Sequence, residues 1–232
     1  MAGRVIPKPY AYPTTPHVRR HGPGGWNDYQ KYRPWLRDEF AFRCVYCLER
    51  EVWRDMRGRM HIDHFQPQAL RPDLECDYTN LLYLCPACNG LKRDLVFPDP
   101  CVVALGDCLR VHKDGRIEAI NDNEDGKLLI DRLALDEPPA RARRRIIIGT
   151  ILSFAETNWP MFVEWMRYPE DLPDLSHFPP PRNDKPEGVA QVVGDGKGET
   201  QCRLGLRDRT GNGQRMECAR RGAGAGAYMH LK

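Results

Sequence analysis

The sequence predicts an α+β protein with a small zinc-binding core, a mostly helical extension and a disordered tail. Two Cys-x-x-Cys motifs, at 44–47 and 85–88, enclose a segment that includes an alternating run typical of a strand. Periodic apolar stretches after residue 99 favour helices. We divide the chain into an extended arm (1–29), a core (30–98), a hairpin and helical extension (99–181) and a tail (182–232).

The overall composition indicates a soluble chain of 232 residues, with 41% hydrophobic residues and a net charge of +3. No run approaches the roughly 18 apolar residues needed to cross a bilayer. The first residues lack the apolar core of a signal peptide. We therefore expect a cytoplasmic protein with no membrane partner. Residues 1–43 hold eight basic and three acidic side chains, which suits a nucleic-acid partner or, equally, a solvated leader segment.

The arm and the segment after it differ in character. Five prolines and four glycines within residues 1–29 predict an extended arm rather than a packed element. Pro34 is a favourable first helical residue, and the apolar side chains after it predict a short helix to about Phe42.

The core contains an alternating segment between the two cysteine motifs and the start of a helix within the second motif. Residues 59–65 alternate and end before Pro67, which predicts a strand. Residues 79–84 form a second apolar run that leads into the second cysteine motif. Pro86 then opens a helix of roughly ten residues.

The extension predicts a hairpin followed by helices. Residues 109–120 are two short strands around the turn at 113–115. Residues 126–135 are periodic enough for a helix, and a longer helix is expected over 140–158, where Pro160 ends it.

The tail has the composition of a disordered segment. Residues 182–232 contain ten of the 20 glycines and few large apolar side chains. Such a segment cannot bury enough surface to offset its ordering entropy.

The cysteines point to a metal site. Nine cysteines is an odd number, and closely spaced pairs in a cytosolic chain more often hold metal than form disulfides. Four thiolates about 2.3 Å from one ion complete a tetrahedral zinc site. The alternatives are ordinary buried cysteines or redox dithiols, which would require a βαβ context. We predict a structural zinc ion held by Cys44, Cys47, Cys85 and Cys88.

The segment between the cysteine pairs carries residues suited to phosphodiester hydrolysis. Asp63 and His64 lie on the predicted strand, Asn80 follows 16 residues after His64, and Asn89 follows the second cysteine pair. A histidine with a pKa of about 6.5 can take a proton from water at neutral pH. Mg²⁺ prefers oxygen ligands, which Asp63 and Asn89 supply.

The combined pattern C-x2-C, D-H-x-x-P, N-L and C-x2-C-N-x2-K resembles the zinc-knuckle branch of the HNH endonuclease family. The resemblance covers roughly residues 32–95 and implies a ββα-metal (His-Me finger) fold, in which a β-hairpin packs on a helix. It implies that His64 is the general base and that Asp63 and Asn89 hold a catalytic Mg²⁺ or Mn²⁺. Asn80 would fix the intervening loop and orient His64. The family often has histidine where Asn89 stands here, which leaves the metal preference open.

Three further residues near this pattern have two readings each. His61 shares a strand face with Asp63, so it is either an accessory ligand or a surface histidine. Lys92 and Arg93 follow Asn89 by three and four residues and share its helix face. We expect both to contact DNA phosphates, and a solvated face is the alternative.

The start of the long predicted helix in the extension is basic. Cations are unfavourable at a helix N-terminus, which favours an external anion such as DNA for Arg141, Arg143 and Arg144; solvated arginines are the alternative. The extension also resembles, on looser spacing, that of bacterial HNH proteins related to the Septu and retron anti-phage systems. This second resemblance implies a partner ATPase.

These features together predict a metal-dependent DNA endonuclease, with a role in bacterial or phage DNA defence or restriction. One active site hydrolyses one strand, so a monomer would nick DNA, and whether two copies pair as a homodimer to cut both strands is left open. The main alternative is a non-catalytic zinc-binding module that binds nucleic acid or protein, and a redox dithiol protein is another. Asp63, His64 and Asn89 together favour the enzyme, because binding alone needs none of them.

Overall fold

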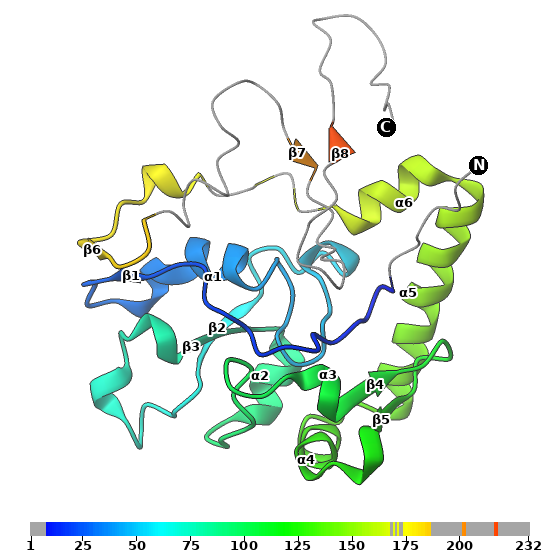
Figure 1. Cartoon of the computed structure of the whole chain (residues 1–232), viewed down its shortest axis with the longest axis horizontal. Helices are drawn as coiled ribbons and strands as arrows, with labels where there is room; N and C mark the ends of the chain where they lie inside the picture. Colours follow the sequence, from blue (N-terminus) through cyan, green and yellow to red (C-terminus); the bar gives the residue numbers. More distant parts are fainter. Residues whose placement is uncertain are drawn as a thin grey trace, which may run out of the picture.

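The computed structural model describes residues 8–167, 169, 171 and 174–186, and the backbone of residues 201–202 and 216–217. The helices and strands are β1 (Pro23–Gly24), α1 (Arg33–Glu39), β2 (His61–His64), β3 (Leu81–Leu84), α2 (Pro86–Lys92), α3 (Leu105–Cys108), β4 (Leu109–Val111), β5 (Ile117–Ala119), α4 (Glu124–Arg132), α5 (Pro138–Thr157), α6 (Trp159–Met166), β6 (Arg182–Asn183), β7 (Gln201–Cys202) and β8 (Met216–Glu217). The strands pair antiparallel as β1–β6, β2–β3, β4–β5 and β7–β8. The α+β prediction is confirmed (Figure 1).

The hairpin of β2 and β3, with α2 directly after it, forms the centre of the fold. Ile62 lies opposite Tyr83 and Asp63 lies opposite Leu82. All four residues of β3 are buried, since α1 packs on β3 while α2 packs on β2. A hairpin followed by a helix that packs against it is the ββα arrangement that the sequence resemblance implies.

The helix α1 has a proline in its first turn, as predicted, and buries Trp35 completely. It ends at Glu39, however, and not near Phe42. Ala41 and Phe42 have positive φ values of 52° and 56°. An α-helix of L-residues cannot continue through this left-handed backbone, so the chain turns here towards the first cysteine motif.

The arm packs against the protein, which corrects the prediction of an unpacked segment. Tyr10, Tyr12 and His21 are buried, and the Tyr12 hydroxyl donates to the main-chain oxygen of Tyr46 at 2.7 Å. Figure 1 shows this segment, in dark blue, running across the molecule from the side of α5 to α1. Apolar burial of its aromatic rings outweighs the proline-rich composition, which excludes a helix but not packing.

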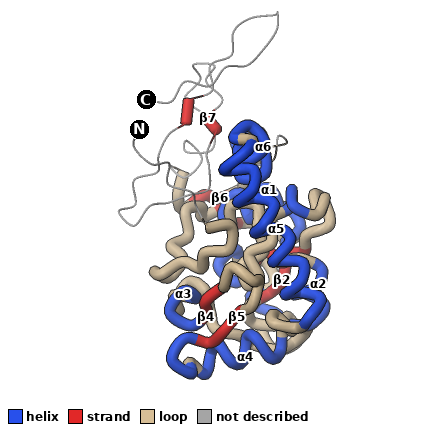
Figure 2. The backbone as a smooth tube through the Cα atoms, turned by 90° about the vertical axis from the view of Figure 1, so that its right-hand side faces the viewer, coloured by secondary structure: helices blue, strands red, loops and turns tan. Residues whose placement is uncertain are grey.

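The extension contains the predicted hairpin and helices, and one additional helix. Pro160 does not simply end the long helix α5; it lies in the first turn of α6. A proline fits there because its missing N–H would have no helical partner. Asn158 caps α6 by accepting a hydrogen bond from the N–H of Met161 at 3.2 Å. Figure 2 shows α5 extending from the β4–β5 hairpin and α4 at one end to α6 at the other.

The helix α6 is anchored to the core through its main-chain oxygens. Arg50 Nη1 donates to the oxygen of Met166 at 2.7 Å, and Trp53 Nε1 donates to that of Trp165 at 2.8 Å. Among the described residues, the buried apolar side chains between Tyr10 and Leu175 form a continuous core. The division between core and extension at residue 98 stays a prediction.

The start of the tail is ordered by pairing with the arm. Arg182 and Asn183 form β6, which pairs with Gly24 and Pro23 of β1, so the predicted start of disorder at residue 182 is too early. Beyond Pro186 the prediction falls on residues outside the described part of the chain, apart from the backbone of β7 and β8. Among the described residues, no helix has the length and apolar character needed to cross a membrane.

Candidate active site and cysteine cluster

The four cysteines predicted to bind zinc lie together. Their Sγ atoms all lie within 4.8 Å of one another, and the Sγ atoms of Cys47 and Cys85 are 3.6 Å apart. A tetrahedral zinc ion with Zn–S bonds of about 2.3 Å places its sulfur ligands about 3.8 Å apart. The thiols therefore fit a structural zinc ion.

Two local structures bring these thiols together. Cys44 and Cys47 occupy the turn after α1, and Cys85 caps the N-terminus of α2. The Cys85 sulfur accepts a hydrogen bond from the N–H of Cys88 at 3.4 Å. Hydrogen bonds from the Cys44, Cys47 and Cys88 thiols hold the pKa of Cys85 far below its ordinary value. A thiolate is the form that binds a metal.

Asp63 and His64 are neighbours at the end of β2, and both are largely buried. His64 Nε2 lies 2.9 Å from the main-chain oxygen of Glu75. A carbonyl oxygen only accepts, so Nε2 carries the proton and Nδ1 keeps its lone pair in the neutral ring. The ring of Tyr29 meets the His64 ring edge-on, with centroids 4.8 Å apart. These contacts fix both the tautomer and the orientation of His64.

Asn80 holds the loop between β2 and β3. Its Oδ1 accepts from the N–H of Gln66 at 2.8 Å, and its Nδ2 donates to the main-chain oxygens of Gln66 at 3.1 Å and Leu74 at 3.3 Å. Leu74 directly precedes Glu75, whose oxygen accepts from His64. This is the geometry expected of a residue that fixes the loop and orients the histidine.

Lys92 is fully buried and faces β2. Its Nζ lies 2.9 Å from Asp63 Oδ2 and donates to the main-chain oxygen of His64 at 2.9 Å. Burial raises the pKa of Asp63, while Lys92 opposes the shift. The predicted phosphate contact of Lys92 is therefore wrong, because the ammonium is enclosed and already paired.

Asn89 lies one turn before Lys92 on α2 and is half-buried, so it shares the helix face that meets β2. Asp63 Oδ2 is buried and forms an ion pair with Lys92 Nζ at 2.9 Å. A carboxylate on β2 and an amide on the helix face that packs against β2 are the oxygen ligands that a hard divalent cation prefers. His61, by contrast, is exposed at the other end of β2 from His64.

The predicted DNA-binding arginines of α5 have partners within the protein. Arg141 forms an ion pair with Asp136, and Arg143 Nε lies 2.6 Å from Glu49 Oε1. Arg144 is buried and donates to the main-chain oxygen of Gly115 at 2.8 Å, so a DNA contact for it is wrong. These acceptors within the protein offset the unfavourable placement of cations at a helix N-terminus, so no external anion is needed to explain it. Arg93, at the end of α2, is exposed.

Sequence reasoning missed two contributors to the site. Tyr29 comes from the arm, and no spacing rule connects it to His64. Glu75 contributes through its main-chain oxygen, which carries no side-chain signal. The buried role of Lys92 had one signal in the sequence, its place on the same helix face as Asn89.

The hairpin, the following helix and the cysteine cluster define a ββα domain with a four-cysteine metal site. Residues 44–95 match the model of the family described as HNH endonuclease. This part of the chain is therefore an HNH domain, as the sequence resemblance predicts, and such domains generally indicate a nuclease. No curated protein matches the chain.

Proposed function

We propose that the protein is a metal-dependent endonuclease that hydrolyses phosphodiester bonds in DNA. The observation that carries the proposal is the arrangement of His64. Its Nε2 donates to the main-chain oxygen of Glu75 at 2.9 Å, beside an Asp63 that faces α2. This leaves Nδ1 as the basic nitrogen in a site that also offers oxygen ligands.

In this proposal, His64 Nδ1 takes a proton from the water that attacks the scissile phosphate. Asn80 acts through the loop it holds, because that loop carries the Glu75 oxygen that orients His64. Lys92 keeps Asp63 in place on β2 through its ion pair.

Asp63 and Asn89 would hold a divalent cation, Mg²⁺ or Mn²⁺. When bound, such an ion polarises the phosphate and stabilises the leaving oxygen. Arg93 is the remaining proposed phosphate contact near the site. A cytoplasmic location, a homodimer, a partner ATPase and a role in DNA defence rest on the sequence alone.

The experiment is a cleavage assay on supercoiled plasmid DNA with Mg²⁺ or Mn²⁺, and with EDTA as the metal-free control. We expect relaxation of the plasmid by the unmodified protein only when the divalent ion is present. His64→Ala should abolish cleavage while zinc content and folding stay intact, because the side chain binds water and not zinc. His61→Ala, an exposed histidine on the same strand, is the matched control and should remain active. Near wild-type nicking by His64→Ala would exclude His64 as the base.

A non-catalytic zinc-binding module is the second candidate, and one observation favours it. The Lys92 ammonium lies 2.9 Å from Asp63 Oδ2, so the carboxylate is already neutralised without a metal ion. Such a module would bind DNA or protein equally well in EDTA-treated and His64→Ala samples, provided its zinc is retained. Metal-dependent nicking that His64→Ala removes would decide for the nuclease.

A further inference from the structure

We propose that Arg19, in the arm, is a positioning residue for the candidate active site. It holds the turn Tyr78–Asn80, and through that turn the loop that orients His64. The catalytic consequence of this inference rests on the proposed nuclease function. The structural consequence does not, and it can be measured separately.

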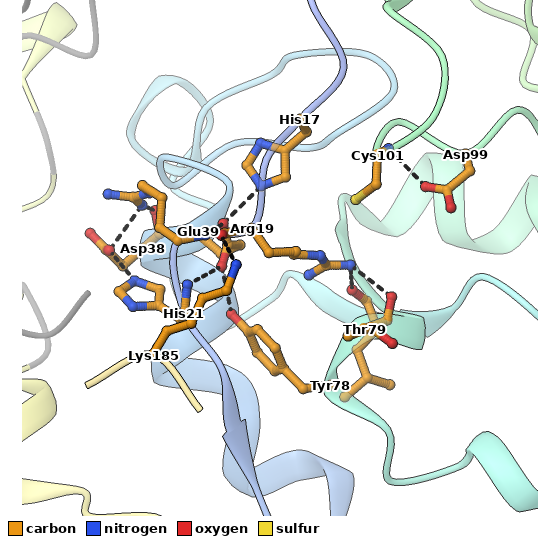
Figure 3. Close-up of polar contacts among 12 residues, drawn as sticks. His17, Arg19, His21, Asp38, Glu39, Tyr78, Thr79, Asp99, Cys101 and Lys185 are labelled. Atoms are coloured by element: carbon orange, nitrogen blue, oxygen red, sulfur yellow. Dashed lines mark hydrogen bonds and ion pairs between the residues drawn. The ribbon is translucent and has the colours of Figure 1, made fainter. Parts of the chain in front are cut away.

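The guanidinium of Arg19 binds the chain on both sides of Asn80. Its Nη2 donates to the main-chain oxygens of Thr79 at 3.1 Å and Leu81 at 2.7 Å. The same group lies over the ring of Tyr78, 5.3 Å from the centroid. Figure 3 shows the side chain reaching from the arm to this turn. A single side chain thus links the arm to the main chain of Thr79 and Leu81, the two residues that flank Asn80.

The arm is itself held firmly on either side of Arg19. The buried carboxylate of Glu39 accepts from the main-chain N–H groups of Arg20 at 2.9 Å and His21 at 3.1 Å. The same carboxylate accepts from the Tyr78 hydroxyl at 3.1 Å, so it joins the arm to the turn a second time (Figure 3). Lys185 Nζ donates to the main-chain oxygen of Arg19 at 2.6 Å. Because its backbone is fixed, Arg19 can restrain the turn and does not merely follow it.

The contacts continue from the turn to the candidate base. Asn80 Oδ1 accepts from the N–H of Gln66 at 2.8 Å, and Asn80 Nδ2 donates to the oxygen of Leu74 at 3.3 Å. The next residue, Glu75, accepts from His64 Nε2 at 2.9 Å. Loss of the Arg19 hydrogen bonds should therefore loosen the hydrogen bonds of Asn80 and the orientation of His64.

The test uses the full chain and compares three variants. Arg19→Met keeps the apolar stem on the Tyr78 ring but removes both hydrogen bonds. Arg19→Lys should restore them in part, because both come from one nitrogen atom. Lys185→Met is the comparison variant, since it removes one of the contacts that hold the Arg19 backbone but leaves the Arg19 hydrogen bonds to the turn in place.

The first readout is amide hydrogen exchange at Gln66, which reports its hydrogen bond to Asn80 directly. We expect exchange at least about 10-fold faster in Arg19→Met and partial recovery in Arg19→Lys. Lys185→Met should accelerate exchange much less than Arg19→Met, because Glu39 still holds the arm. Exchange of the His112 amide, which donates to the oxygen of Arg116 at 2.8 Å in the distant β4–β5 hairpin, should stay constant in all three. Should Arg19→Met fail to fold, Arg19→Gln carries the same comparison.

The second readout is steady-state cleavage of plasmid DNA. A misplaced base should lower kcat by about 10- to 100-fold in Arg19→Met and leave KM for DNA unchanged. Unchanged Gln66 exchange in Arg19→Met, or equal acceleration in Lys185→Met, would overturn the proposal. So would a raised KM with unchanged kcat, which would mark Arg19 as a direct DNA contact. If the unmodified protein cuts no DNA, the nuclease proposal fails while Gln66 exchange still decides the role of Arg19.

Discussion

Two buried carboxylates, those of Asp63 and Glu39, are kept ionised by different kinds of partner. Asp63 is paired with a buried ammonium, with Lys92 Nζ 2.9 Å from its Oδ2. Glu39 instead accepts hydrogen bonds from the arm and from Tyr78. Taking a carboxylate out of water is costly, so each must have such partners to stay ionised.

The Asp63–Lys92 pair should contribute strongly to stability. We expect Lys92→Met to lower the free energy of unfolding by roughly 3–5 kcal/mol, because it leaves a buried carboxylate without its counter-charge. Urea unfolding in buffer without divalent ions measures this. Arg93→Met, at the exposed neighbouring position, should change stability by no more than about 0.5 kcal/mol. Equal effects of the two substitutions would show that the ion pair adds nothing.

The pKa of Glu39 predicts a stability change at acid pH. Burial opposes ionisation, but hydrogen bonds from His17 and the Arg20 N–H outweigh it and lower the pKa from 4.5 to about 2. The folded-state pKa lies below the unfolded one, so this stability is present above about pH 5 and is lost as pH falls towards 2. The loss should reach about 3 kcal/mol.

Glu39→Gln is the test variant for this pH dependence, because it keeps the shape of the side chain and cannot ionise. Unfolding free energies of both proteins between pH 5 and pH 2 should converge as the pH falls. Parallel curves over that range would contradict the assignment to Glu39.

At the scale of secondary-structure elements, the cysteine cluster links pieces that the hairpin alone does not hold. Cys44 and Cys47 follow α1, and Cys85 and Cys88 begin α2. A metal ion in this cluster therefore fixes α2 against the turn after α1. Because α2 also carries Asn89 and Lys92, the cluster sets the position of the helical half of the candidate active site.

Removal of one thiol should therefore destabilise the whole domain and not only the metal site. A structural zinc ion contributes on the order of 10 kcal/mol of apparent binding energy in small domains, which is comparable to the whole stability of a domain. We expect Cys85→Ala to be insoluble or to melt without cooperativity, and to contain no zinc. Cys76→Ala, a half-buried cysteine outside the cluster, should behave like the unmodified protein. Zinc analysis and thermal unfolding measure both; a soluble Cys85→Ala protein with unchanged Tm would refute the structural role.

At the scale of the whole molecule, the two ends of the described chain pack on the HNH domain together. β1 of the arm pairs with β6, and Lys185 donates to the main-chain oxygen of Arg19. In the extension, Arg143 pairs with Glu49, which lies next to the first cysteine motif. Segments that precede and follow the HNH domain in the sequence thus both pack against it.

This packing predicts where the chain can be shortened. A protein ending at Pro186 should keep its zinc and its Tm, because it retains β6 and Lys185. A protein ending at Pro181 loses both, and its Tm should fall by about 2–4 °C for each kcal/mol lost. Thermal unfolding of the two shortened proteins and the full chain makes the comparison. Identical Tm values for all three would show that the β1–β6 pairing does not stabilise the fold.

The sequence by itself determined the features that depend on short spacing. The cysteine motifs, the Asp63–His64 pair and the Asn80 position are set by local order along a strand, a turn and a helix start. Pro86 and the alternation before Pro67 were enough to place the elements that carry them. Local geometry follows from a few neighbouring residues, so these predictions need no knowledge of the remaining chain.

Only the tertiary structure decided which charges are buried and which segments pack. From the sequence, Lys92 and Arg144 are expected to be surface cations. In the fold, Lys92 forms a buried ion pair with Asp63, and Arg144 is buried and donates to the main-chain oxygen of Gly115. Arg19 reaches a turn 60 residues away. The solvation of a charge depends on every group around it, and those groups come from distant parts of the chain. Spacing along the sequence therefore cannot specify them.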